Sequence, residues 1–196
     1  MIAAGEIESV GREVTSFKPG DQVSGMDGFR AGTYAGKVCW PATAALAPLP
    51  ANLTYKESAA LPYGGLLASF FVRRLNVRTG QRLLVYGASR AIGTATVQLA
   101  MHLGAEVTGV CSTANLELVR SLGATTVIDY TKDDFTQSGS RYDLIFDAVG
   151  KRKSAKAMLN AGAALASGGV SMSVDDAFPR TKKSDLFVPR AARSGR

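Results

Sequence analysis

Two glycines, Gly87 and Gly93, lie six residues apart and enclose a serine and an arginine, Ser89 and Arg90. An apolar run, residues 83–86, precedes this loop, and apolar residues at helical spacing follow it. A glycine turn at the start of a helix presents backbone N–H groups and the positive end of the helix dipole, a combination that binds phosphate. The residues that we expect to contact a pyrophosphate are Gly87, Ser89, Arg90, Ala91, Ile92 and Gly93.

The spacing of these glycines differs from the usual dinucleotide fingerprint. That fingerprint is G-x-G-x-x-G, in which separate glycines form the tight turn, admit the phosphates and let the helix pack on the strand. This loop reads G-x-x-x-x-x-G. The Arg90 side chain either crowds a pyrophosphate or pairs with one of its oxygens. The strand, turn and helix of an α/β protein that binds no nucleotide would explain the loop as well.

Strand-like and helix-like segments alternate along the rest of the chain. The helix after the loop has its apolar residues at Ile92, Ala95, Leu99 and Leu103. This alternation predicts an α/β fold with a Rossmann-type, doubly wound parallel sheet, which binds ligands beyond the carboxyl ends of its strands. The expected strands are residues 83–86, 106–111, 126–128, 142–146 and 169–174, and the further helices are residues 115–122 and a segment around 154–159.

Three segments follow the carboxyl ends of these strands and are expected to converge. Ser112 and Thr113 follow the second strand, Asp129 and Tyr130 follow the third, and residues 147–150 follow the fourth. Their side chains include hydroxyls, carboxylates and an aromatic ring. The sequence therefore predicts a polar ligand site at this edge of the sheet.

The end of the second strand indicates which dinucleotide would bind. Sites for NAD commonly place an acid there to hold the ribose hydroxyls, whereas a carboxylate would repel the extra phosphate of NADP. This chain has Cys111, Ser112 and Thr113 at that point and no acid. We therefore predict NADPH, with no cation assigned to the extra phosphate. The alternative role for Ser112 and Thr113 is to cap a helix ahead of Asn115.

The residues available for a metal site are few. The sequence contains one histidine, His102, and two cysteines, Cys39 and Cys111. A structural zinc site needs four ligands and a catalytic one usually three. We therefore expect no zinc. The two cysteines are expected in separate strands, as reduced residues of the interior.

The positive charge is concentrated in the last part of the chain. The net charge is +7, and residues 151–196 contain ten Lys or Arg against three Asp or Glu, so the whole excess lies there. Residues 179–196 are expected to form a disordered basic tail, and no pattern of a specific nucleic-acid reader accompanies them. The sequence has no long apolar span and no basic and apolar leader, so we expect neither a membrane helix nor secretion, and a cytoplasmic location.

Several of these segments resemble the medium-chain dehydrogenase/reductase superfamily, in its zinc-independent quinone-oxidoreductase-like branch. Residues 5–25, GEIESVGREVTSFKPGDQVSG, are similar to a hairpin of its GroES-like catalytic domain. Residues 87–100, GASRAIGTATVQLA, look like its phosphate loop, in which Gly usually stands in place of Arg90. Three further segments are similar to the family: residues 49–65, 104–135 and 142–150.

The resemblance implies roles for residues around the predicted site. Ser89 to Gly93 would hold the pyrophosphate, Ser112 and Tyr130 the adenosine side. The nicotinamide side would be formed by Val149, Gly150 and Val174. Tyr130 has the competing role of an ordinary aromatic residue at a strand end, and Asp147 that of orienting a loop rather than transferring protons. No general acid is identified.

The resemblance also implies a domain organisation. Residues 1–62 would form part of a GroES-like domain and residues 63–178 a Rossmann domain that lacks its last strand, so the chain is expected to be truncated at both ends. Gly64 and Gly65 would begin the helix entering the Rossmann domain, or admit a cofactor closely.

The implied activity is NADPH-dependent, zinc-independent hydride transfer to a quinone or to an activated alkene or carbonyl compound. The alternative is a non-catalytic, NADP-binding remnant of such an enzyme. The partners that the resemblance implies are a small-molecule substrate, a quinone or an enone, and a second copy of the chain in a homodimer.

Overall fold

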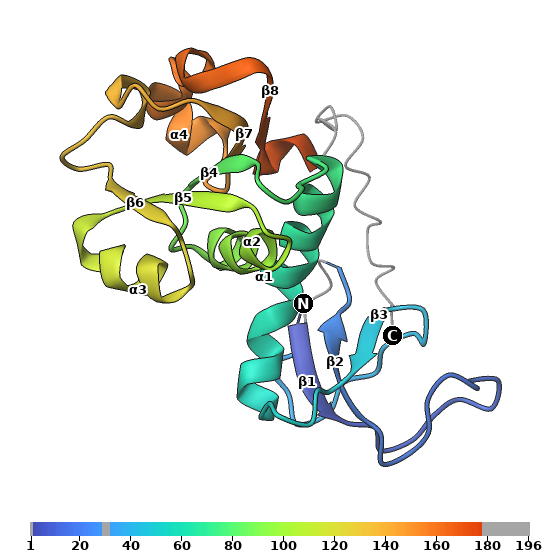
Figure 1. Ribbon diagram of the computed structural model, residues 1–196. Helices are drawn as coiled ribbons and strands as arrows, with labels where there is room; N and C mark the ends of the chain where they lie inside the picture. Colours follow the sequence, from blue (N-terminus) through green and yellow to red (C-terminus); the bar gives the residue numbers. More distant parts are fainter. Residues whose placement is uncertain (1, 29–31, 178–196) are drawn as a thin grey trace, which may run out of the picture.

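A five-stranded parallel sheet forms the larger part of the fold (Figure 1), and a three-stranded antiparallel sheet precedes it. The computed structural model describes residues 2–28 and 32–177, so the predicted basic tail, residues 179–196, lies outside the described residues. The strands are β1 (Ile2–Glu6), β2 (Gln22–Met26), β3 (Ala45–Pro48), β4 (Arg82–Tyr86), β5 (Glu106–Cys111), β6 (Thr126–Asp129), β7 (Tyr142–Asp147) and β8 (Leu165–Ser173). The α-helices are α1 (Tyr55–Arg74), α2 (Ala91–His102), α3 (Leu116–Ser121) and α4 (Lys151–Met158). Short 3-10 helices are η1 (Thr113–Asn115), η2 (Phe135–Gln137), η3 (Ala161–Ala164) and η4 (Val174–Ala177).

The strand order of the parallel sheet is β6-β5-β4-β7-β8. Every pairing in this sheet is parallel, which confirms the predicted doubly wound α/β fold. The chain moves outward from β4 through β5 to β6 and then returns to the other side of β4 with β7. The order therefore reverses between β4 and β7, and such a reversal leaves a crevice beyond the carboxyl ends of the two strands where ligands bind.

The central strands are buried on both faces, as their continuous apolar runs predict. Leu83 and Val85 of β4 pack into a core with residues of α1, α2 and α3, whereas Leu84 of the same strand packs into a second core. This second core contains Phe135 of η2 and Ala161 of η3. Helical segments thus cover the sheet on both sides and fix the position of its loops.

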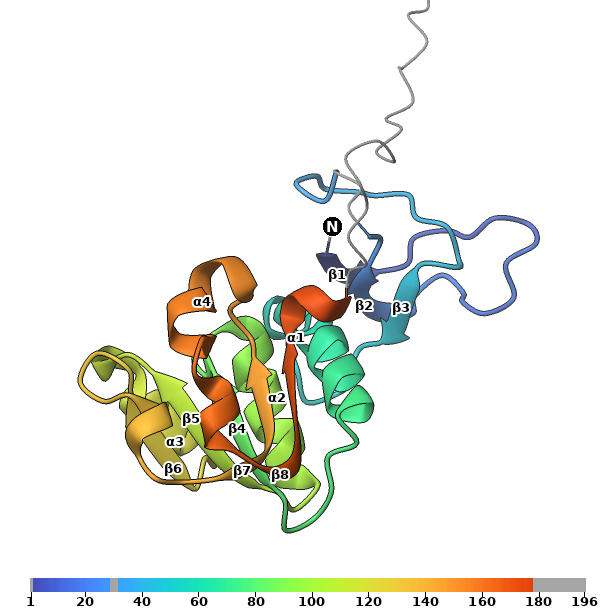
Figure 2. The same cartoon turned by 90° about the horizontal axis from the view of Figure 1, so that it is seen from above.

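Helix α1 lies between the two sheets (Figure 2) and contacts β1 and β2 as well as α2. It begins at Tyr55 because Thr54 and Glu57 form a capping box, in which the Glu57 amide donates to Thr54 Oγ1 (3.3 Å) and the Thr54 amide to Glu57 Oε2 (2.9 Å). The bond from the Thr54 amide, and a second one from the Thr54 hydroxyl to the same carboxylate oxygen (2.7 Å), lower the pKa of Glu57. The expectation that Gly64 and Gly65 begin this helix is wrong, because they lie in its middle.

Three other expectations about secondary structure need correction. Strand β8 begins at Leu165 rather than at residue 169, and Val174 lies outside it, as the first residue of η4. Cys39 is exposed and lies in no strand, unlike the buried Cys111 of β5. The helix expected at residues 115–122 is divided into η1 and the shorter α3. No helix in the described part of the chain is both long and apolar enough to span a bilayer.

Candidate functional site

The loop between β4 and α2 is hydrogen-bonded to the neighbouring strand, β5. The amides of Gly87 and Ala88 both donate to the carbonyl of Val110 in β5, at 2.9 and 3.0 Å, and Gly87 has a φ of +80°. The first bond of the α2 ladder runs from the Thr94 amide to the Arg90 carbonyl (2.7 Å). The amides of Ala91, Ile92 and Gly93 therefore precede the ladder, as the donors of an anion site do.

Gly87 and Gly93 are in close contact, which explains the unusual spacing of the glycines. A Cβ on Gly93 would lie 2.2 Å from the Gly87 carbonyl oxygen and 2.9 Å from the Cα of Ala88. Backbone atoms cannot yield as a flexible side chain can, so only glycine allows α2 to approach the turn this closely. The two glycines thus fill the turn and packing roles of the fingerprint, as predicted from the sequence.

The loop after β7 lies directly beside the loop after β4. The Ala148 amide donates to the carbonyl of Tyr86 (3.0 Å), and a Cβ on Gly87 would lie 2.5 Å from Cγ2 of Val149. Gly150 is buried and has a φ of +101°. The structure therefore brings Val149, predicted for the nicotinamide side, against Gly87 of the glycine loop at the point where the strand order reverses.

Asp147 holds the loop after β7 in place through hydrogen bonds to its carboxylate. Asp147 is only 2% exposed, and its carboxylate accepts hydrogen bonds from the amides of Val149 (2.9 Å) and Gly150 (3.2 Å). It also accepts from the hydroxyls of Ser154 in α4 and Ser173 in β8. This geometry supports the alternative, given from the sequence, that Asp147 orients a loop. Ser154 and Ser173 were not predicted, because no local sequence pattern links them to the carboxylate.

The predicted adenosine side lies at the ends of β5 and β6. The Tyr130 amide donates to the Cys111 carbonyl (3.0 Å), and the Tyr130 side chain is 52% exposed. Ser112 precedes η1 but makes no side-chain capping bond, and its hydroxyl instead accepts from Nδ2 of Asn115 (2.9 Å). The capping alternative for the Ser112 side chain is therefore wrong.

Asp129, one of the residues expected to converge at the carboxyl ends of the strands, places a carboxylate beside the end of β5. It accepts from the hydroxyls of Thr113 (2.5 Å) and Thr131 (2.7 Å) and from the Thr131 amide (3.0 Å). The Thr113 bond is the main cause of a lowered pKa of Asp129, with Thr131 and Lys132 acting in the same direction against the effect of burial. Asp129 is therefore an anion beside the end of β5, and Thr113 is directed toward it.

Tyr86 is a further residue that sequence reasoning missed. Its ring centroid lies 6.1 Å from that of Tyr130 and 6.1 Å from that of Phe135. Burial is the main cause of a raised pKa of the Tyr86 hydroxyl, and Tyr130, Asp147 and Asp134 raise it further. The hydroxyl thus stays protonated at neutral pH, at the carboxyl end of the central strand. A tyrosine closing an apolar strand was the available signal.

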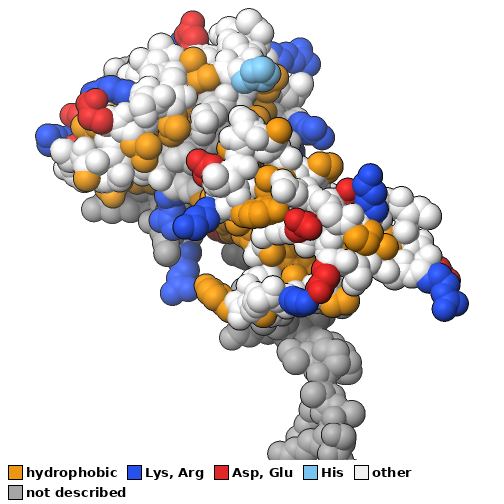
Figure 3. Space-filling view, turned by 90° about the horizontal axis from the view of Figure 1, so that it is seen from below, with side chains coloured by type: hydrophobic (Ala, Val, Ile, Leu, Met, Phe, Trp, Pro, Cys, Tyr) orange, Lys and Arg blue, Asp and Glu red, His pale blue; other side chains and the backbone are white. Residues whose placement is uncertain are grey.

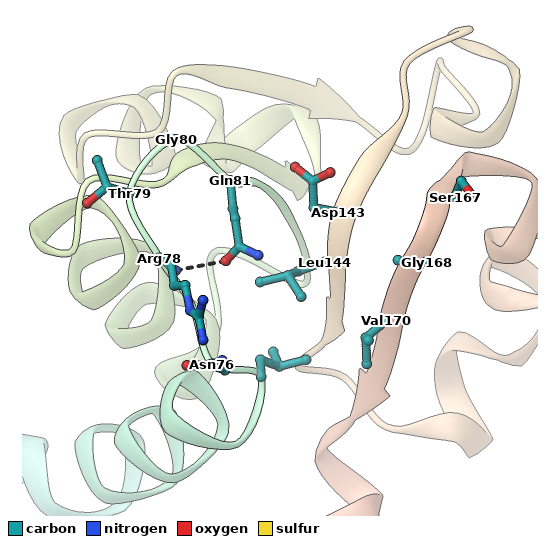
Figure 4. A pocket seen from close by; sticks show the side chains of 12 residues that line it. Asn76, Arg78, Thr79, Gly80, Gln81, Asp143, Leu144, Ser167, Gly168 and Val170 are labelled. Carbon is teal, nitrogen blue, oxygen red and sulfur yellow. Dashed lines mark hydrogen bonds between the residues drawn. The ribbon is translucent and has the colours of Figure 1, made fainter.

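A cavity of about 590 Å³ lies away from this site (Figure 4). Its walls include Arg78, Gln81 and Asp143, near the amino ends of β4 and β7, and Gly168 of β8. The Arg78 amide donates to Oε1 of Gln81 across one side of it (2.8 Å). The cavity is thus at the opposite edge of the sheet from the glycine loop and belongs to a different part of the molecule.

The side chains that could ligate zinc lie apart in the described part of the chain. His102 ends α2 and is exposed, and Figure 3 shows its side chain in pale blue at the surface. Cys39 is exposed, whereas Cys111 is buried, with a pKa raised by burial and by the charge of Asp129. Among residues 2–28 and 32–177, no three His, Cys, Asp or Glu side chains gather as metal ligands would.

Known proteins are similar to this chain in sequence and in fold. A family model described as zinc-binding dehydrogenase matches residues 91–187. The 2-methylene-furan-3-one reductase of Solanum lycopersicum is 32% identical over 167 residues, which cover 81% of this chain and 43% of that protein. The chain therefore spans less than half the length of this relative.

Solved structures agree with this match. The quinone oxidoreductase from Coxiella burnetii superposes with a TM-score of 0.79 at 26% identity, covering 88% of this chain and 54% of that one. A mycobacterial protein complexed with NADPH superposes with a TM-score of 0.71 at 28% identity, covering 86% of this chain and 53% of that one. The similarity thus extends over most of this chain and about half of each of the two solved structures.

Proposed function

Since this chain belongs to the medium-chain dehydrogenase/reductase superfamily, in its quinone-oxidoreductase-like branch, we propose that it binds NADPH and reduces a quinone or an activated alkene or carbonyl compound. The observation that supports this most directly is the contact between two loops at the reversal of the strand order. The glycine loop after β4 and the loop containing Val149 and Gly150 lie against each other there, beyond the carboxyl ends of β4 and β7, where a doubly wound sheet binds its ligand.

The glycine loop would hold the pyrophosphate. The amides of Ala91, Ile92 and Gly93 precede the helical ladder and supply donors, and the N-terminus of α2 supplies a positive partial charge. Ser89 and the exposed Arg90 add a hydroxyl and a guanidinium. The space that a Cβ would fill at Gly87 and Gly93 is occupied by backbone and by Val149, so the loop is already closely packed without a ligand.

The two other regions would divide the rest of the dinucleotide between them. Ser112 and Tyr130 would hold the adenosine side, and Val149, Gly150 and Val174 the nicotinamide side. A bound NADPH supplies the hydride, while the protein supplies position and a surface from which water is excluded. The partly buried Val149 and Val174 suit the exclusion of water.

The preference for NADPH over NADH is part of the proposal. It is supported by the absence of an acid at residues 111–113 and by the hydroxyl of Ser112. Asp129 does not take the place of such an acid, because its oxygens already accept hydrogen bonds from Thr113 and Thr131. The mycobacterial relative is seen with NADPH, which supports the same cofactor.

The choice of substrate class is supported by the relatives. One is named for reduction of a 2-methylene-furan-3-one and another as a quinone oxidoreductase. Zinc-independent reduction is proposed because the described side chains lack a suitable set of metal ligands. The domain limits at residues 1–62 and 63–178, a cytoplasmic location and a homodimer remain predictions.

A second candidate function is dinucleotide binding without turnover. It is supported by the amides at the N-terminus of α2, which can hold a dinucleotide whether or not a substrate is reduced. Both candidates require the same cofactor site. Only turnover distinguishes them.

The first test is a fluorescence titration of the folded chain with NADPH and with NADH at the same salt concentration. We expect tighter binding of NADPH. Binding of neither nucleotide by protein with a native circular dichroism spectrum would overturn the cofactor assignment. If NADPH binds, oxidation of NADPH in the presence of a quinone and of an enone supports catalysis, and a lack of oxidation with both favours binding alone.

A further inference from the structure

The carboxylate of Asp147 is a buried charged group for which the proposed hydride transfer has no use. It ends β7, is 2% exposed, and lies at the reversal of the strand order. Burying a charge is costly unless hydrogen bonds compensate for the lost water. The bonds that Asp147 receives show which segments it connects.

The two oxygens of the carboxylate accept hydrogen bonds from different parts of the molecule. Oδ1 accepts from the amides of Val149 (2.9 Å) and Gly150 (3.2 Å), within the loop. Oδ2 accepts from the hydroxyls of Ser154 (2.5 Å) and Ser173 (3.0 Å). Ser154 belongs to α4 and Ser173 to the end of β8, so a single side chain joins β7, the loop, the next helix and the next strand.

These contacts occupy both oxygens of the Asp147 carboxylate. Two backbone amides and two serine hydroxyls donate to it, so its hydrogen-bonding capacity is taken up by the protein itself. The group is also buried beneath the loop rather than open to the crevice. Its effect on a ligand must therefore pass through the backbone that it holds.

That backbone forms one wall of the proposed cofactor crevice. Val149 is packed so closely on Gly87 that a Cβ there would lie 2.5 Å from its Cγ2. Gly150 has a φ of +101°, and a Cβ on it would lie 3.1 Å from Oδ1 of Asp175. The Ser154 hydroxyl also lies 2.9 Å from the Gly150 carbonyl, so its one hydrogen is shared between that carbonyl and Oδ2 of Asp147.

We propose that Asp147, together with Ser154 and Ser173, is a positioning residue that fixes Val149 and Gly150 against the glycine loop and so sets the affinity for the nicotinamide half of the dinucleotide. This inference rests on the proposed function, since it assumes that the crevice holds a nicotinamide dinucleotide. It predicts an effect confined to one end of that ligand.

The test compares two ligands that differ only in the nicotinamide end, NADPH and 2′-phospho-ADP-ribose. The variants are Asp147→Ala, Asp147→Asn, Ser154→Ala and Ser173→Ala. Ser58→Ala is the matched control, because the Ser58 hydroxyl is buried in α1 with no hydrogen-bond partner among the described residues. The titrations use the whole chain.

We expect Ser154→Ala and Ser173→Ala to weaken NADPH binding about tenfold, the effect of one lost hydrogen bond to a charged group, without changing the affinity for 2′-phospho-ADP-ribose. Asp147→Ala should have a larger effect of the same kind. Asp147→Asn should retain part of the NADPH affinity, because its amide oxygen still accepts from the two loop amides. Ser58→Ala should bind both ligands as the parent chain does.

Equal weakening of both ligands, or no weakening of either, in the two serine variants would overturn the inference. If Asp147→Ala fails to fold, these serine variants still decide it. If the parent chain binds neither ligand, the proposed function fails instead, and hydrogen exchange then tests the positioning role. Faster exchange of the Val149 and Gly150 amides in Ser154→Ala than in Ser58→Ala supports it, and equal exchange rejects it.

Discussion

Arg90 is the residue of the glycine loop whose role the sequence left open between crowding and pairing. Its backbone N-caps α2 with an extended conformation (φ −91°, ψ 163°), and its side chain is exposed. No hydrogen bond or ion pair of its guanidinium occurs within the described residues. An exposed cation at a helix N-terminus is well placed to pair with a phosphate.

Replacing Arg90 with Ala should therefore weaken NADPH binding by about tenfold at low salt, the effect of one charge-assisted hydrogen bond. The difference from the parent chain should shrink as salt screens the charge. Isothermal titration at two salt concentrations measures both effects. Arg78→Ala, at the opposite edge of the sheet, is the control and should bind as the parent chain does. Tighter binding by Arg90→Ala would show that the side chain crowds the ligand.

Asp129 makes the free energy of unfolding depend on pH. Its folded-state pKa lies below the ordinary value of 3.8, chiefly because Thr113 donates a hydrogen bond to it. A depressed pKa means that the carboxylate stabilises the fold above its ordinary pKa. That contribution is lost as the pH falls through the lowered pKa.

The parent chain should thus be more stable than Asp129→Asn near neutral pH, and the difference should narrow as the pH falls below about 4. Urea unfolding at several pH values gives this difference directly. Asp133→Asn, which removes an exposed carboxylate nearby, controls for the loss of one charge. A difference that stays constant down to acidic pH would contradict the assignment.

At the scale of the secondary-structure element, the adjacent glycines Gly64 and Gly65 of α1 differ in what surrounds them. A Cβ on Gly64 would lie 2.5 Å from the carbonyl oxygen of Ala91, the first residue of α2, whereas a Cβ on Gly65 would meet nothing within 4 Å. Gly64 thus permits α1 to touch the N-terminus of α2. Because α1 also contacts β1 and β2, this helix crossing connects both sheets to the glycine loop.

Gly64→Ala should lower the free energy of unfolding by about 1–3 kcal/mol, the usual cost of overpacking. Gly65→Ala should raise it by about 0.5–1 kcal/mol, because alanine favours the helix over the unfolded chain. Chemical denaturation of the two variants gives both values. Equal effects at the two positions would mean that the close contact with Ala91 is not significant for stability.

Strand β8 shows how an element can be predicted in part. The strand-like run after Gly168 and Gly169 indicated a start at residue 169, but the strand already pairs with β7 at Leu165 and passes through an irregularity before Val170. Leu165 belongs to the strand because it pairs with Tyr142 of β7, although regular pairing resumes only at Val170. The local sequence pattern of β8 contains no information about the neighbouring strand with which it pairs.

At the scale of the whole molecule, ligand binding should stabilise one part of the chain more than another. A hundredfold excess of NADPH over its Kd stabilises a folded state by about 2.7 kcal/mol. Hydrogen exchange should slow most at residues 87–93 and 147–150 and remain unchanged in β1, β2 and β3. Mass spectrometry of peptides from both sheets measures this. Protection confined to β1, β2 and β3 would place the site elsewhere.

The sequence by itself determined the alternation of strands and helices, the buried central strands and the glycine loop. These features depend on the periodicity of apolar residues and on the conformations open to glycine, both of which are local properties. Gly87 and Gly93 were recognised as turn and packing residues for this reason. The fold class followed from them because alternating strands and helices allow few arrangements.

Only the tertiary structure decided which distant residues meet. Asp129 lies beside Thr113, sixteen residues earlier, and Asp147 accepts from Ser173, which is twenty-six residues away. It likewise placed Tyr86 with Tyr130 and Phe135, and Val149 against Gly87. Such contacts depend on the order of neighbouring strands, on register and on the angles at which helices cross the sheet. These properties arise from the packing of the whole chain, so no short stretch of sequence specifies them.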